Sequence, residues 1–169
     1  FATETSTVPG NIFDSRINGP RNLAIVRINR NDNSIDSSLP DTLTVLSVGV
    51  QQTNRLKWLT HYSNSSDLHA ERPKLIGIGN DRYVVLWEEW LNTGAWSDTF
   101  NGVYGMVIDD SGDISKAATL ITSEHHLPRG DDAFRLDNRA AWVTGNAVGR
   151  KLFIHLVDAT LNYEMATLD

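Results

Sequence analysis

Tryptophans and carboxylates lie together in one short stretch, Trp87-Glu88-Glu89-Trp90, and Trp96 and Asp98 follow it. Aromatic rings beside acids are typical of a sugar-binding surface, because ring faces pack on sugar C–H groups while carboxylates accept hydrogen bonds from hydroxyls. Side chains alternate along a strand, so Glu88 and Trp90 are expected on the face opposite Trp87. We expect Trp87 in the core; for Trp90 and Trp96 we favour packing of the loop onto its own sheet, with ligand contact as the alternative. The ligand-binding candidates are therefore Glu88, Trp90, Trp96 and Asp98.

A glycoside hydrolase would need two carboxylates roughly 5 to 9.5 Å apart across a pocket. Glu88 and either Asp131 or Asp132 would form such a pair if their two loops meet. Acids on exposed loops are usually only solvated. The sequence has no Ser/His/Asp ordering, no phosphate-binding glycine loop and no nucleotide fingerprint. We therefore predict no catalytic residues, and a carbohydrate-active enzyme is the alternative.

The tripeptide Arg129-Gly130-Asp131 is of the type that integrins recognise, although such tripeptides also arise by chance. It falls in a segment that we expect to be an exposed loop, where binding residues are often found. Arg129 and Asp131 therefore join the ligand-binding candidates.

Histidines and turn acids provide weaker candidates for metal binding. His125-His126 lacks metal-ligand spacing on a strand, because adjacent side chains point to opposite faces. The other histidines stand alone in the sequence, and we expect them to be solvated or to have ordinary partners: His61, His69 and His155. The acids around Asp109 and Asp32 lack the ligand spacing of a calcium loop and suit tight turns. We predict no metal site and no cofactor, with calcium as the alternative.

Composition excludes several classes of protein. The chain has 169 residues, 15 of them basic and 21 acidic, and a net charge of −6. Scattered charge of this kind has no electrostatic footprint for nucleic acid or a membrane surface. No run approaches the roughly 20 apolar residues of a membrane span, and without cysteine there is no disulfide framework. The sequon at Asn64 is a candidate glycosylation site, so we expect a secreted or cell-surface protein.

Four short apolar runs in the centre of the chain must position these residues. They span residues 74–78, 83–87, 103–108 and 118–121. Gly79-Asn80-Asp81 and Asp109-Asp110-Ser111-Gly112 connect them in pairs, and these residue types tolerate the positive φ of tight hairpins. The run at 83–87 is apolar throughout, which favours a strand buried on both faces. We predict one four-stranded antiparallel meander.

Similar segments recur on both sides of this meander. Apolar runs closed by Asp- or Asn-rich turns begin at Leu23, Val103 and Leu152, and further β runs span residues 42–50 and 56–61. No window has sustained helical periodicity, which disfavours an α/β enzyme. We predict repeats of about 50 residues. The expected organisation is an extended N-terminal arm at 1–20, followed by units at about 21–61, 62–122 and 123–169.

The central unit resembles the β-propeller repeats of large secreted and surface bacterial proteins. The resemblance rests on these residues: Pro73, Leu75, Asn80-Asp81, Tyr83-Val84-Val85, Trp87, Gly102-Val103-Tyr104-Gly105, Ile108-Asp109 and Gly112. It covers about one blade, and Arg82 stands where the family usually has glycine. The resemblance implies that the long segments at 62–71, 91–101 and 123–132 lie on one face, where such a scaffold usually has its ligand site.

The predicted fold is therefore all-β, built of antiparallel four-stranded meanders, and forms a partial β-propeller of about three blades or a segment of a larger one. A β-sandwich is the alternative. Three blades do not close a ring, and exposed sheet edges need cover. We expect a non-catalytic binding or assembly module whose partners are other chains or the rest of a longer precursor, because the chain begins at Phe1 rather than methionine. A glycan is a candidate ligand, and a lectin-like module is a further alternative.

Overall fold

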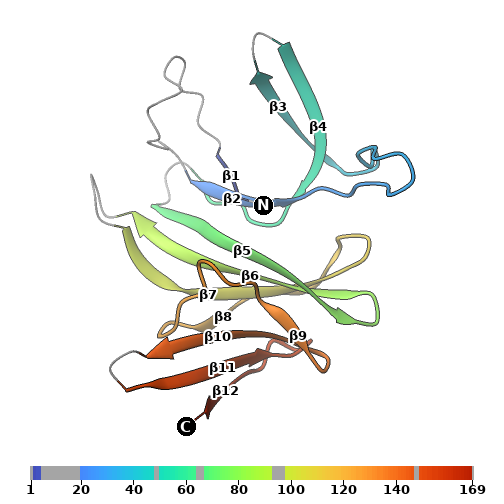
Figure 1. Ribbon diagram of the computed structural model, residues 1–169. Helices are drawn as coiled ribbons and strands as arrows, with labels where there is room; N and C mark the ends of the chain where they lie inside the picture. The colour runs from blue at the N-terminus through green and yellow to red at the C-terminus, as the bar shows by residue number, and fades with distance from the viewer. Residues whose placement is uncertain are drawn as a thin grey trace. The chain divides into compact units, whose positions relative to one another are not determined.

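The computed structural model describes residues 2–4, 20–47, 50–63, 67–92, 98–146 and 149–168. Every regular element in these ranges is a β-strand, and the strands form three four-stranded antiparallel sheets (Figure 1). The all-β prediction is confirmed. No helix long and apolar enough to cross a membrane occurs among the described residues. The chain divides into two compact units, Phe1–Ser66 and Asp67–Asp169, and each is described by itself.

The first unit contains strands β1 (Ala2–Glu4), β2 (Arg21–Ile25), β3 (Asp41–Ser47) and β4 (Val50–Trp58). Their order is β1-β2-β4-β3, so this sheet is not a simple meander. β4 begins earlier than expected and includes the polar residues 51–55, which form a hairpin with β3. Asn22 and Thr60 join the segment after β4 to β2, because the Thr60 hydroxyl accepts from the Leu23 amide at 2.8 Å and Asn22 Oδ1 accepts from the Tyr62 amide at 2.6 Å.

The second unit begins with the predicted meander. Its strands are β5 (Leu68–Gly79), β6 (Arg82–Asn92), β7 (Asp98–Asp109) and β8 (Ile114–Thr122), and they pair in sequence order. Both predicted turns contain backbone with positive φ, at Asn80 and Asp81 in the first and at Gly112 in the second. The pairing of neighbours confirms the meander.

A second meander follows in the same unit. It consists of β9 (Phe134–Leu136), β10 (Arg139–Asn146), β11 (Lys151–Val157) and β12 (Tyr163–Leu168), again paired in sequence order. One apolar core joins the two sheets: Ile76, Ile78, Val84, Leu86, Val103, Val107 and Ile121 from the first, and Ala140, Trp142 and Val157 from the second. The two meanders therefore pack face to face, as layers of four-stranded sheet.

Two segments that we expected to be loops are partly strand. β5 begins at Leu68 although 62–71 was predicted as a loop, and β6 and β7 reduce the predicted loop at 91–101 to the residues between Asn92 and Asp98. In β5 the strand continues past Pro73 through a bulge. Arg72 and Pro73 together oppose one residue of β6, the register shifts between Glu71 and Lys74, and Arg72 has a φ of 51°.

The predicted unit boundaries and the N-terminal arm stay predictions. β1 pairs with Arg21–Leu23, while residues 5–19 lie outside the described ranges.

Candidate functional site

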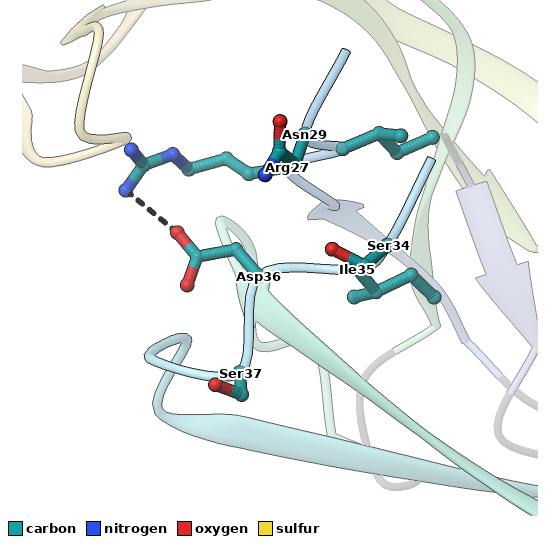
Figure 2. A pocket seen from close by; sticks show the side chains of 7 residues that line it. Arg27, Asn29, Ser34, Ile35, Asp36 and Ser37 are labelled. Atoms are coloured by element: carbon teal, nitrogen blue, oxygen red, sulfur yellow. Dashed lines mark ion pairs between the residues drawn. The ribbon is translucent and has the colours of Figure 1, made fainter. Parts of the chain in front are cut away.

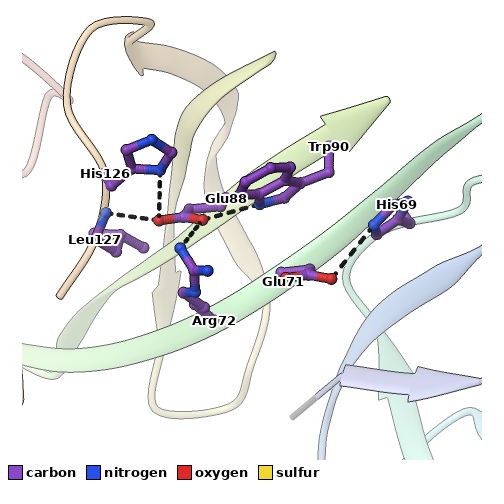
Figure 3. A network of polar contacts seen from close by, with 7 residues as sticks. All are labelled: His69, Glu71, Arg72, Glu88, Trp90, His126 and Leu127. Atoms are coloured by element: carbon purple, nitrogen blue, oxygen red, sulfur yellow. Dashed lines mark hydrogen bonds and ion pairs between the residues drawn. The ribbon is translucent and has the colours of Figure 1, made fainter. Parts of the chain in front are cut away.

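A buried carboxylate lies at the centre of a polar network in the second unit (Figure 3). Glu88, on β6, is fully buried. Its Oε2 accepts from the Arg72 guanidinium and, at 2.9 Å, from the indole Nε1 of Trp90. Its Oε1 accepts from the Leu127 amide at 2.8 Å and lies 3.4 Å from His126 Nδ1. Both oxygens of Glu88 thus have protein partners, so the carboxylate has a structural role in this arrangement.

The network joins a loop to the sheet that it covers. Residues 123–133 connect β8 to β9, and Leu127 of this loop is buried in the core between the two sheets. The Lys74 ammonium donates to the Asp131 carbonyl at 2.9 Å, which adds a second link between β5 and the loop. Loss of one partner from a buried ion pair costs about 3–5 kcal/mol, so Arg72 is expected to be important for this end of the fold.

Trp90 packs against its own sheet and against the loop that follows β8. Its ring meets Phe100 edge to face, with centroids 5.6 Å apart, and lies 5.8 Å from the His126 ring. The Arg72 guanidinium carbon lies 5.5 Å from the Trp90 ring centroid. Glu88 and Trp90 share a face, as the alternation predicted, and the indole N–H points to the carboxylate rather than to solvent.

Trp87 lies in the interior, as predicted, and stacks on Tyr104 with centroids 6.1 Å apart. Glu89, two residues further on, is also buried and accepts from Asn101 Nδ2 at 2.6 Å. Burial raises the pKa of the Tyr104 phenol, and the nearby Glu89 carboxylate adds to this shift. β6 thus contains a second buried acid, on the face opposite Glu88, which the sequence did not single out as a site.

The remaining candidates are scattered. Arg129 and Asp131 are exposed in the loop, as expected for the tripeptide, while Glu88 is enclosed. The Asp132 carboxylate, also exposed, lies 3.7 Å from the Lys74 ammonium. Trp96 and Asn64 lie outside the described residues. Glu88 is thus buried and occupied by partners, whereas Asp131 and Asp132 are exposed.

His69, which stands alone in the sequence, lies beside two carboxylates in the structure. Its Nε2 lies 3.4 Å from Glu71 Oε1 and 3.6 Å from Asp98 Oδ2. His69 and Glu71 are on β5 and Asp98 begins β7, so three residues of one sheet meet at its end. The alternation His-x-Glu could have indicated two ligands on one strand face, but we assigned 62–71 to a loop.

His155 lies in the second meander and is fully buried. Tyr163 Oη lies 2.8 Å from its Nδ1 and Thr144 Oγ1 lies 2.7 Å from its Nε2. Its ring stacks on Trp142 with centroids 4.7 Å apart. Burial lowers the pKa of His155 from 6.5 to about 4, with a further contribution from the neighbouring His125. His155 is thus a satisfied core histidine, as expected.

The aspartates at the turns accept hydrogen bonds from backbone amides of the same turns. Asp109 Oδ1 accepts from the amides of Ser111 and Asp113 at 2.9 and 2.8 Å. Asp32 accepts from the amide and hydroxyl of Ser34, and these hydrogen bonds lower the pKa of its carboxyl. These contacts are those of Asx-type turns, which agrees with the conformational role that the sequence favoured.

The first unit contains a pocket beside the turn at residues 29–34 (Figure 2). It is lined by Arg27, Ile28, Asn29, Ser34, Ile35, Asp36 and Ser37. Its charged groups face each other, with Arg27 Nη1 and Asp36 Oδ2 3.1 Å apart. Asp36 also accepts from the hydroxyl and amide of Ser38, and these hydrogen bonds, with Arg27, lower its carboxyl pKa. The two charged residues that line the pocket are therefore paired with each other.

Comparison with known proteins assigns no function to these sites. The chain matches no protein-family model, no curated protein and no solved structure. Function has to be inferred from the geometry of the described residues.

Proposed function

We propose that the chain is a non-catalytic binding and assembly module, and that the sheet β9–β12 receives a further antiparallel sheet from a partner chain on its outer face. The observation that carries this proposal is a difference in burial: apolar positions that are buried in β5–β8 are exposed at the equivalent positions of β9–β12. One meander has an apolar face covered by the other, while the corresponding face of the second is open to solvent among the described residues.

The equivalence of the two sheets follows from their registers. Arg82 and Arg139 each follow a turn with positive φ, at Asn80-Asp81 and at Asp137. Counting from these arginines, Leu86 corresponds to Val143, and their cross-strand partners Gly105 and Ile154 correspond as well. Val103 lies two residues before Gly105, and it corresponds in the same way to Leu152, two residues before Ile154. The face of β5–β8 that β9–β12 covers is therefore equivalent to the outer face of β9–β12.

This outer face is apolar but uncovered. Val103 is fully buried, whereas its equivalent Leu152 is 49% exposed. Val143 is 37% exposed, although its equivalent Leu86 is fully buried. Other exposed apolar side chains on this sheet face are Phe134, Leu136 and Leu168. An exposed apolar patch that spans all four strands of a sheet is typical of an interaction surface.

The covered face indicates what the partner should present. The buried side chains with which β9–β12 covers its neighbour are Ala140, Trp142 and Val157, and the Tyr163 ring packs against this core. A flat four-stranded surface is matched in area by another sheet, whereas a single helix covers only part of it. The proposed partner is therefore an antiparallel sheet with an apolar face that includes a bulky aromatic side chain.

Repeated face-to-face packing of four-stranded meanders is how propeller blades are arranged, and it supports a composite β-propeller as the form of the assembly. β8 and β12 are also outer edges of their sheets, with no strand beyond them in the part of the chain that is described. A secreted or cell-surface location is part of this proposal and is supported by the sequon at Asn64. Both oxygens of Glu88 have partners within the chain, which disfavours glycoside hydrolysis by this residue.

The test uses the 169-residue chain itself, in sedimentation velocity and with the dye ANS. We expect concentration-dependent self-association and dye binding, because an uncovered apolar face binds any available apolar surface. Leu152→Lys combined with Leu168→Lys should abolish both. The matched control is Thr167→Lys, which places the same charge at an exposed position of β12 with the opposite strand parity.

Circular dichroism should be used to check that each variant is folded. A wild-type chain that stays monomeric over the concentration range and binds no dye overturns the proposal. Association that the double variant leaves unchanged overturns it too, because the contact would then lie elsewhere.

A further inference from the structure

Three potential metal ligands converge at the end of the β5–β8 sheet where β5 and β7 begin. They are His69 and Glu71 of β5 and Asp98 of β7, and one ligand atom of each lies within 4.8 Å of the others. His69 pairs with Trp90, and Glu71 pairs with Glu88, so both side chains of β5 are on the face that carries the Glu88 network (Figure 3). Asp98 pairs with Asn92, two residues beyond Trp90, which places it on this face as well.

His69 Nε2 is buried and has no hydrogen-bond partner. The side chain is only 8% exposed. An unsatisfied buried polar atom is rare in a native protein, and each case asks for an explanation such as an ion. Glu71 Oε1 and Asp98 Oδ2 are its nearest charged neighbours, at 3.4 and 3.6 Å. These separations are too long for good hydrogen bonds.

The same separations suit atoms that share one ion. Zinc binds histidine nitrogen and carboxylate oxygen at roughly 2.0–2.2 Å, and two ligands of a tetrahedron at that radius are about 3.4 Å apart. The two distances from His69 Nε2 are close to this value. One imidazole and two carboxylates also form a donor set that first-row divalent metals accept.

We propose that His69 Nε2, Glu71 and Asp98 bind one divalent metal ion, with zinc as the preferred occupant. Asp98 is 40% exposed, so the open side of the site faces solvent and leaves room for a water molecule as the fourth ligand. The ion would connect the beginning of β5 to the beginning of β7, on either side of β6. This inference does not depend on the proposed assembly, because none of the three residues lies on the outer face of β9–β12.

A protonated His69 paired with the two carboxylates is the competing arrangement, and metal titration distinguishes it. The metal-stripped chain is titrated with zinc chloride by calorimetry and, separately, with cobalt(II) by absorption spectroscopy. We expect one saturable zinc site per chain, a rise in Tm on zinc addition, and cobalt absorption of tetrahedral intensity. An ion pair alone gives none of these, and their absence overturns the proposal.

Variants assign the site to these residues. His69→Gln and Asp98→Asn should each weaken zinc binding by more than the roughly 10- to 100-fold that loss of an outer-shell partner costs. The matched control is His61→Gln, which removes an exposed histidine and should leave affinity and stoichiometry unchanged. Asp98 is partly exposed, so Asp98→Asn tests the site even if His69→Gln does not fold. Wild-type affinity in a folded Asp98→Asn chain overturns the assignment.

Discussion

The two meanders of the second unit have the same strand order but bury different polar groups. β5–β8 encloses the Glu88 carboxylate and compensates its charge with Arg72. β9–β12 encloses His155, whose neighbours suit a neutral ring, because Tyr163 and Thr144 each offer a hydroxyl to one ring nitrogen. A buried charge needs an opposite charge, whereas a buried neutral imidazole needs only two hydrogen-bonding groups. The same topology therefore tolerates two kinds of interior, which should respond differently to mutation and to pH.

The largest effect should follow from removing the counter-charge in the first meander. Arg72→Met leaves a buried carboxylate without its cation, and we expect a loss of about 3–5 kcal/mol in the free energy of unfolding. Urea denaturation measures it. The double variant Arg72→Met with Glu88→Gln should be more stable than the single variant, because the uncompensated charge is gone. Equal stability of the two would contradict the role assigned to this ion pair.

The second meander should instead be sensitive to acid. His155 has a folded pKa of about 4, below its ordinary 6.5. Between these values the unfolded chain binds the extra proton, so stability is complete above pH 6.5 and decreases as the pH falls towards 4. The full shift corresponds to about 3 kcal/mol. Denaturation at several pH values should show a smaller loss in this window for His155→Gln; an unchanged pH profile would refute the assignment.

Because one sheet face is covered and its equivalent is exposed, we predict a difference of about 1 kcal/mol or more between equivalent truncations. Leu86→Ala removes a fully buried side chain and should cost about 2–5 kcal/mol. Val143→Ala at the equivalent exposed position should cost less than about 1 kcal/mol in the isolated chain. Thermal denaturation of both variants gives the comparison. Similar costs at the two positions would mean that Val143 is covered in solution.

The smallest effect should come from the loss of one hydrogen bond to the buried His155 ring. Thr144→Val keeps the shape of the side chain but removes the hydroxyl 2.7 Å from His155 Nε2. We expect a loss of about 1 kcal/mol in the free energy of unfolding. Chemical denaturation of this variant beside Thr167→Val, an exposed threonine of β12, provides the measurement and its control. If Thr144→Val lost more free energy of unfolding than Arg72→Met, the buried charge would not be the more sensitive of the two interiors.

Local patterns were enough to predict the meander. Turn residues at Gly79-Asn80-Asp81 and the apolar run at 83–87 define neighbouring antiparallel strands through short-range chemistry. They also placed Trp87 in the core. The pairing of β2 with β4 depends on contacts between distant residues, such as those of Asn22 with Tyr62, and alternation along one strand contains no information about them.

The candidate site could be predicted only in part. Glu88 and Trp90 were correctly placed on one face, but their partners come from elsewhere in the chain. Leu127 reaches Glu88 through a loop whose course depends on the packing of two sheets. Arg72 and His69 were missed because we expected a loop at 62–71 and a strand only from residue 74, whereas β5 begins at Leu68 and continues through a bulge at Arg72-Pro73.

The bulge in β5 also determines how the chain tolerates changes in length. Counting back by twos from Ile78 and Ile76 would place Ala70 on the core face, yet the observed pairing places His69 and Glu71 there. One additional residue at Arg72-Pro73 thus inverts the inside-outside pattern of the first part of the strand. A deletion of one residue at this point would not merely shorten β5. It would exchange its two faces, and the histidine and the acid would leave their present neighbours together.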